Sequence, residues 1–359
     1  MPFATLPYLT GTVLMIGVAG FLLSSCYVPR QGSHLVAQQI AARPISSISE
    51  EERTSSEQDL FAQVHRVRSF AADELGLTLG TSYTTYYRTD RDHLVDVVSA
   101  AREFSFERKE WWFPVFGRFP YKGFYRPEPA RRLARRLDGR GWDVIIRPVD
   151  AFSTLGYFKD PVISFMADYP VERLAELIMH EAAHATVWLR GHSQFNEEFA
   201  TFVGRVGAEL YLSERYGADS PELRALVRRR RDQDRFRADV LALKEELRTL
   251  YREQSHLPQR ELRAAKRDRI TSYQQAYATR YSERYETDTF RFFSEITVNN
   301  AYLDLFDTYS GNLDRFYRFH RRVGGSRLEM TIAEISRRAA AWENRPRTDR
   351  PDPITLLEE

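Results

Sequence analysis

The stretch L-I-M-H-E-A-A-H-A-T, residues 177–186, reads as one helix with the pattern H-E-x-x-H in its middle. His180 and His184 are four residues apart, so both imidazoles project from the same face of that helix. Glu181 lies about 100° around the helix axis from His180, close to the imidazoles but off their line. The surrounding residues are mostly apolar, and a buried glutamate beside two histidines would be costly without a partner. These residue types at this spacing therefore indicate a metal centre.

A third metal ligand is expected nearby, because a catalytic zinc ion needs three protein ligands and an open position for water. Glu197 and Glu198 follow thirteen and fourteen residues after His184, in F-N-E-E-F-A-T, residues 195–201. That interval is long enough to end the first helix, turn at 191–193 and begin a second helix near Asn196. Either glutamate could be the ligand, and the two would project from different sides of the helix. Thr201 lies on the same face as Glu197 and could hydrogen-bond a ligand histidine.

One Zn²⁺ ion held by these residues would carry a water molecule whose pKa falls towards 7. Glu181 would take the proton of that water and pass it to the leaving amine of a peptide substrate. The oxyanion of the tetrahedral intermediate needs a further donor. We expect that donor from the apolar segment that carries Asn299, Asn300, Tyr302 and Tyr309.

A candidate substrate-binding strand precedes the helix that carries the two histidines. In zinc peptidases an edge strand at this place binds the substrate backbone by strand addition. We expect this role for the segment that begins with Ser153, Thr154, Leu155 and Gly156 and ends at Tyr157. A plain turn at Gly156 is the alternative.

The composition argues against a nucleic-acid binder and an intrachain disulfide, and the position of the single cysteine points to a signal peptide. The chain of 359 residues has 52 basic and 50 acidic residues, which gives no case for a nucleic-acid binder. Its single cysteine, Cys26, excludes an intrachain disulfide. The apolar run 12–23 is too short to span a bilayer comfortably and fits the core of a signal peptide. L-S-S-C, residues 23–26, resembles the bacterial lipobox, in which the cysteine is lipidated and residues 1–25 are removed.

Attachment to a membrane through lipid at Cys26 is the consequence that we expect. Residue 27 is tyrosine, not aspartate, so there is no obvious signal for retention at an inner membrane. The prediction is a protein of the bacterial cell envelope that faces the periplasm, at the outer membrane. Against it, residues 1–10 carry no Lys or Arg, whereas signal peptides normally begin with basic residues. An uncleaved anchor or a misassigned start is the alternative.

Helical patterns predominate elsewhere, and they predict a mainly helical α+β fold with a small mixed or antiparallel sheet. The expected helices are 32–42, 49–75, 128–137, 196–216, 221–254, 258–285 and 292–306; the expected strands are 82–88 and 93–100 as a hairpin, then 142–147 and 161–165. The two long charged helices predict a projecting hairpin whose basic run, 228–231, is solvated or near anionic lipid.

The expected organisation along the chain follows from these elements. It comprises a signal peptide over 1–25, an N-terminal helical segment over 26–80, a metallopeptidase domain over 81–343 and a C-terminal tail over 344–359. The charged hairpin, about 221–287, would be inserted in the metallopeptidase domain.

H-E-x-x-H followed by N-E-x-F-A resembles the gluzincin metallopeptidases. The resemblance implies that His180, His184 and Glu197 bind zinc and that Glu181 is the catalytic base, and it favours Glu197 over Glu198. The chain has no G-x-M-E-N segment, which in the large zinc aminopeptidases meets the substrate's amino terminus.

A closer resemblance is to the bacterial family of predicted aminopeptidases, which are usually described as lipoproteins. It is carried by W-x-F-P-V-x-G-x-x-P-Y-x-G-[YF] (111–124), A-[YF]-S-T-L-G-[WY]-F-x-D-P-[VI]-x-S (151–164), L-I-x-H-E-x-A-H (177–184), F-N-E-x-F-A-T-F-V (195–203), and N-N-A-x-L with a later T-Y (299–303, 308–309). The family often has cysteines where Trp112 and Arg118 stand here, so a disulfide there is absent. By this resemblance Tyr309, more than Tyr302, is the oxyanion donor.

Two other functions are compatible with the same sequence. One is a non-catalytic envelope scaffold that works through the charged hairpin, although a scaffold has no need of Glu181. The other is a zinc amidohydrolase with a non-peptide substrate.

Overall fold

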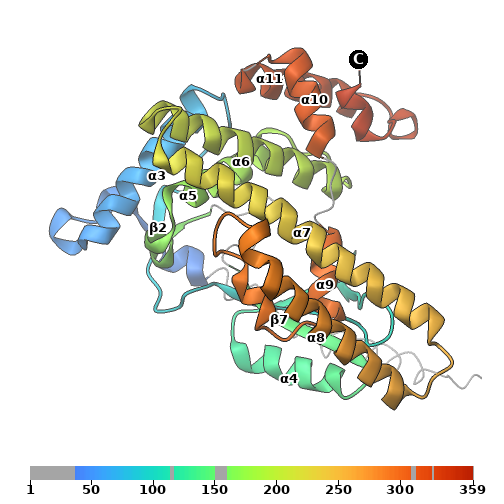
Figure 1. The fold of residues 1–359 in the computed structure, drawn as a ribbon. Helices are drawn as coiled ribbons and strands as arrows, with labels where there is room; N and C mark the ends of the chain where they lie inside the picture. The colour runs from blue at the N-terminus through green and yellow to red at the C-terminus, as the bar shows by residue number, and fades with distance from the viewer. Residues whose placement is uncertain (1–36, 114–116, 150–159, 309–312, 326, 359) are drawn as a thin grey trace, which may run out of the picture.

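The computed structural model describes residues 37–113, 117–149, 160–308, 313–325 and 327–358 and shows a mainly helical α+β fold (Figure 1). The fold class is therefore as predicted. The α-helices are α3 (Ser55–Asp73), α4 (Pro127–Asp138), α5 (Val171–Thr186), α6 (Ser193–Tyr216), α7 (Pro221–Glu253), α8 (Gln259–Arg284), α9 (Asn300–Thr308), α10 (Leu313–Val323) and α11 (Leu328–Glu343). The strands are β1 (Arg43–Pro44), β2 (Thr85–Tyr87), β3 (Val95–Arg102), β4 (Trp111–Phe113), β5 (Gly117–Phe119), β6 (Tyr121–Phe124), β7 (Trp142–Val149) and β8 (Val162–Ile163). Over these ranges the structure shows no helix that is both long and apolar enough to cross a membrane.

The largest apolar core lies where α3, α5 and α6 pack together, and α10 and α11 cover α6 from the other side (Figure 1). Helix α3 begins at Ser55 because Thr54 caps it: the Thr54 hydroxyl accepts a hydrogen bond from the N–H of Glu57, and the Glu57 carboxylate accepts one from the N–H of Thr54. The predicted apolar stripe of this helix is buried in the core. Helix α3 therefore shares a core with α5 and does not form a separate N-terminal unit.

The two segments predicted as a hairpin, 82–88 and 93–100, lie in different sheets, so that prediction is wrong. Strand β2 lies between β1 and β8, antiparallel to β1 and parallel to β8. Strand β3 lies between β6 and β7 and is antiparallel to both. An alternating pattern shows that a segment is extended but does not reveal which strand it pairs with. Because β3 contacts both α4 and α9, its residues 95–101 are all buried.

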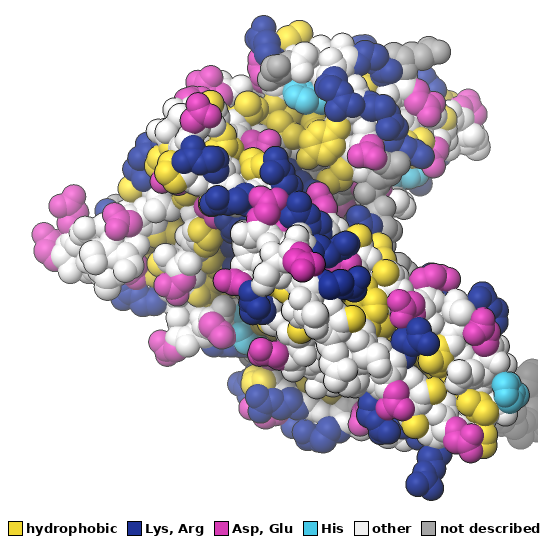
Figure 2. Space-filling model, viewed as in Figure 1, with side chains coloured by type: hydrophobic (Ala, Val, Ile, Leu, Met, Phe, Trp, Pro, Cys, Tyr) yellow, Lys and Arg dark blue, Asp and Glu magenta, His cyan; other side chains and the backbone are white. Residues whose placement is uncertain are grey.

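Helices α7 and α8 form the predicted hairpin, but it is not a solvated projecting arm. Phe236, Val240, Leu243 and Leu247 of α7 build a second apolar core with α8, α9 and the 3₁₀ turn η4 (Arg291–Ser294). Figure 2 shows basic and acidic side chains interspersed over the face that these helices present. The hairpin therefore supports α9 through an apolar interior and keeps its mixed charges outside.

The basic run 228–231 was expected to be solvated or near anionic lipid, and two of its arginines instead pair with glutamates of the main core. Arg229 forms an ion pair with Glu172 of α5. Arg230 forms ion pairs with Glu176 of α5 and with Glu209 of α6. These pairs fasten α7 across the two helices of the main core.

The C-terminal third differs from the prediction at two places. Helix α9 begins at Asn300, not at residue 292, because the Asn299 side chain accepts a hydrogen bond from the N–H of Tyr302 (2.9 Å) and so caps the helix. The 344–359 segment, expected to be a tail, contains the 3₁₀ helices η5 (Arg347–Asp349) and η6 (Pro353–Leu357). Leu356 and Leu357 are buried against α10 and α11, so this end of the chain is part of the main core.

Candidate metal centre

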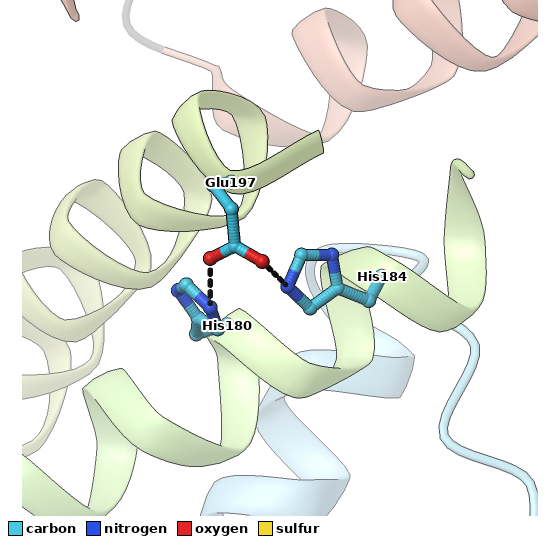
Figure 3. A group of neighbouring side chains, drawn as sticks. All are labelled: His180, His184 and Glu197. Atoms are coloured by element: carbon cyan, nitrogen blue, oxygen red, sulfur yellow. Dashed lines mark ion pairs between the residues drawn. The ribbon is translucent and has the colours of Figure 1, made fainter. Parts of the chain in front are cut away.

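Helix α5 carries the H-E-x-x-H pattern and is fixed in rotation by its buried face. That face consists of Leu174, Ala175, Ile178, Met179, Ala182 and Ala183. The helix ends at Val187, whose extended backbone (φ −135°, ψ 118°) leads into the turn before α6. His180 and His184 are left on the side that faces α6, with ring centroids 4.8 Å apart (Figure 3).

Asn196 ties the first turn of α6 to the turn that follows α5. Its side chain is fully buried; the carbonyl oxygen accepts a hydrogen bond from the N–H of Leu189 and the amide donates one to the Leu189 carbonyl, both at 2.9 Å. Between them Gly191 has a φ of +88°, a conformation that glycine adopts without strain. This two-point contact sets the start of α6, and it therefore directs the next residue, Glu197, towards the histidines.

Two glycines let α6 approach α5 closely, and the sequence analysis missed them. A Cβ atom on Gly204 would lie 2.8 Å from the backbone oxygen of Glu176 and 3.3 Å from the Cβ of His180. A Cβ atom on Gly207 would lie 2.4 Å from the sulfur of Met179. The G-x-x-G spacing in the middle of an apolar helix was the available signal, since glycine there weakens a helix unless close packing requires it.

Figure 3 shows the Glu197 carboxylate between the two imidazoles. One carboxylate oxygen lies 3.6 Å from Nε2 of His180, and the other lies 3.5 Å from Nε2 of His184. Two ligand atoms about 2.0–2.1 Å from a tetrahedral zinc ion are about 3.3 Å apart, so these spacings are close to those of a zinc site. They are also too long for good hydrogen bonds. Among the described residues, these three form the one group of His, Cys, Asp and Glu side chains able to hold a metal ion.

The protonation states of His184 and Glu197 suit a metal ion, whereas His180 would have to lose a proton that its carboxylate neighbours favour. Burial and the neighbouring His180 lower the pKa of His184 to about 4, so this ring is neutral near pH 7 and can donate a lone pair. Burial opposes protonation of His180, but its carboxylate neighbours, Glu197 first, raise the pKa of His180 overall. Burial would raise the pKa of Glu197, yet the two histidines lower it and keep the carboxylate ionised. The donor set therefore fits a divalent cation.

Glu181 lies beside these three residues, and no described residue forms a hydrogen bond or an ion pair with its carboxylate. Burial is the main cause that raises the pKa of Glu181 to about 7. Asp160 and Glu197 add to the rise by repulsion, whereas His180 opposes it. A carboxyl group with a pKa near neutrality can both accept and release a proton under physiological conditions. This is the property that the sequence analysis assigned to Glu181.

Comparison with models of known protein families identifies the family of this chain. A family model with the description "Putative aminopeptidase" matches residues 26–350. The chain belongs to this aminopeptidase family. The match confirms the family resemblance drawn from the sequence motifs. Comparison with the curated proteins and with the solved structures returned no match.

Two further residues of this aminopeptidase-family chain were candidates on helix α6. Glu198 is buried and its carboxylate accepts a hydrogen bond from Gln194 (2.9 Å), so it does not join the histidines. Thr201 makes no hydrogen bond to either histidine in the described part of the chain. The buried Nδ1 atom of His184 also lacks a partner there, so the support predicted from Thr201 is not seen.

Asn300 was predicted to bind substrate, and the structure contradicts this. The residue is fully buried, and its amide nitrogen donates to the backbone oxygens of Arg102, Glu103 and Ser105. Its carbonyl oxygen accepts a hydrogen bond from the hydroxyl of Tyr251. With every polar atom of the side chain paired inside the protein, Asn300 fastens α9 to the end of β3 and is not available to a ligand.

Six predicted site residues lie outside the described residues: Cys26, Ser153, Thr154, Leu155, Gly156 and Tyr309. Their assigned roles in lipid attachment, substrate binding and oxyanion stabilisation stay predictions. The alternative oxyanion donor, Tyr302, packs its ring between Phe293 and Phe306 in the second core.

Proposed function

We propose that this chain is a zinc-dependent aminopeptidase that hydrolyses peptides. The observation that supports the proposal is the convergence of His180, His184 and Glu197 beside the carboxyl group of Glu181, which no described residue pairs. His180, His184 and Glu197 would hold the ion. A bound Zn²⁺ would supply a polarised water molecule and a positive charge for the substrate carbonyl.

Residues of the chain would transfer the proton of the attacking water to the leaving amine. Glu181 would accept the proton of the attacking water and later donate it to the leaving amine. Burial suits it to the first step, because a carboxylate with a raised pKa accepts a proton more readily, and a pKa near neutrality still lets the group give the proton back. Tyr309 is the proposed donor to the oxyanion. A protein anchored by lipid at Cys26 and facing the periplasm would place this activity in the cell envelope.

Glu181→Gln tests the proposal, because glutamine keeps the shape of the side chain and removes its ability to exchange a proton. Glu214→Gln is the matched control, since Glu214 is an exposed residue at the far end of α6. We expect both variants to retain about one zinc per chain. Hydrolysis of a peptide library should fall about 10²- to 10⁴-fold in the first variant only. Equal activity in the two variants would exclude Glu181 as the base, and a wild type without bound zinc would exclude the metallopeptidase.

A further inference from the structure

Asp160 lies just before β8, and its charge acts on Glu181 beside the candidate metal centre. Its backbone oxygen accepts a hydrogen bond from the N–H of Tyr83 (2.6 Å), which continues the β2–β8 pairing towards the preceding residues. The N–H of Thr78 donates to the Thr186 hydroxyl (2.8 Å) at the end of α5. The segment 78–83 therefore runs from the end of α5 to Asp160. Within this segment Tyr83 is buried. Burial and then the charge of Glu181 raise the pKa of the Tyr83 hydroxyl group.

The carboxylate of Asp160 is partly buried, and no described residue forms a hydrogen bond or an ion pair with it. Burial raises the pKa of Asp160 to about 6. The charges of Asp160 and Glu197 both act on Glu181, so this side of the site holds several carboxylates, and the charge of His180 opposes them at Glu181. A partly buried carboxylate without a counter-ion is unfavourable until a cation reaches it. The site therefore offers a place for a positive group that the described part of the chain does not fill.

The metal ion does not account for this carboxylate. The group of donors close enough to share an ion consists of His180, His184 and Glu197, and Asp160 is outside it. A peptide cleaved after its first residue would itself bring a cation, because its α-ammonium group is bonded to the carbon next to the scissile carbonyl. When that carbonyl lies beside Glu181, the ammonium must lie within a few bond lengths of it.

On the basis of the proposed function, we propose that Asp160 binds the free α-ammonium group of the first residue of the peptide substrate. The interaction is a charge-assisted hydrogen bond, which is stronger than one between neutral groups. An N-acetylated peptide has no charge at this position and would leave the carboxylate unpaired, so the same residue would reject blocked peptides. Asp160 would thereby restrict the centre to removal of N-terminal residues, in a chain that lacks the G-x-M-E-N segment.

Binding of two hydroxamates to the zinc-loaded full chain tests this proposal. The probes are leucine hydroxamate and N-acetyl-leucine hydroxamate; the acetyl group of the second removes the charge of the amine. We expect the wild type to bind the first about 10- to 100-fold more tightly, the range for a hydrogen bond between charged groups. Asp160→Asn should remove this preference and leave binding of the acetylated probe unchanged. Asp168→Asn, at an exposed aspartate of the same region, should keep the preference.

The outcomes separate this proposal from the proposed hydrolysis. A wild type that hydrolyses peptides but cleaves free and acetylated ones equally would overturn the role of Asp160 and leave the hydrolase standing. A preference that persists in Asp160→Asn would also overturn it. A preference that depends on Asp160 in a protein that hydrolyses no peptide would support the ammonium site and refute the hydrolysis. Because no residue in the described part of the chain pairs with the carboxylate, the melting temperature should change little, and Asp160→Ala provides a second variant without the charge.

Discussion

Gly204→Ala should damage the candidate metal centre although alanine favours a helix by about 1 kcal/mol over glycine. The new Cβ atom would lie 2.8 Å from the backbone oxygen of Glu176, whereas ordinary contacts begin near 3.4 Å. Backbone cannot rotate away as a side chain can, so α6 must move from α5 by roughly 0.6 Å at this point. Overpacking of this kind costs about 1–3 kcal/mol, which leaves a net loss of stability of up to about 2 kcal/mol.

The same displacement should weaken zinc binding, because α5 carries the two histidines and α6 carries Glu197. Distances in a metal site tolerate changes of about 0.2 Å, so a shift three times larger should lower zinc affinity by about 10-fold or more. Competition with a chelator measures the affinity, and urea unfolding without metal measures the stability.

Gly207→Ala is the matched control on the same helix. Its Cβ atom would meet Sδ of Met179 and Cδ1 of Leu75, side-chain atoms that can shift more easily than the backbone oxygen beside Gly204. We expect this variant to bind zinc like the wild type. Equal zinc affinity in Gly204→Ala and Gly207→Ala would refute the reasoning that the close approach of α6 to α5 sets the ligand geometry.

Two further predictions concern single carboxylates. Glu197→Gln should lower zinc affinity at least about 100-fold, because loss of a ligand costs more than loss of a residue that only hydrogen-bonds a ligand. Glu198→Gln should leave the zinc affinity unchanged. Comparable losses in both variants would contradict the assignment of Glu197 as the ligand. Glu57 is buried and accepts hydrogen bonds from Tyr86 and Arg88, and these outweigh burial and lower its pKa to about 2. Its stabilisation is complete above the ordinary pKa near 4.5 and is lost as the pH falls towards 2, so between pH 6 and pH 3 the free energy of unfolding should fall by up to about 2 kcal/mol through this group. Urea unfolding of Glu57→Gln should show a correspondingly weaker dependence on pH, and an identical dependence in both proteins would contradict this.

The candidate ligands could be predicted from the sequence because their geometry is local. His180 and His184 are related by one turn of a helix, and a short connection brings Glu197 back to them. The apolar stripe of α3 was predictable for the same reason. The pairing of β2 and β3 was not, because each takes its neighbours from distant parts of the chain and the alternating pattern is the same for any partner.

Polar residues were misread where their partners lie far away in the sequence. Asn300 occurs in a motif and carries an amide that a ligand could use. Its partners, the backbone oxygens of residues 102, 103 and 105, come from the end of β3, and nothing local to Asn300 points to them. The role of Asn196 was equally hidden, since its contact with Leu189 is visible only once the turn has formed.

The arginines of α7 show why a charged helix can matter to a site that it does not touch. Arg230 is mostly buried, and its ion pairs with Glu176 and Glu209 bridge α5 and α6. Glu176 lies one helical turn before His180, so Arg230 fixes the very part of α5 that approaches Gly204. Since Arg230 also donates to the backbone oxygen of Arg205, its guanidinium is committed to both helices at once. Through these contacts the charged hairpin stabilises α5 and α6 at the separation that the three candidate ligands need.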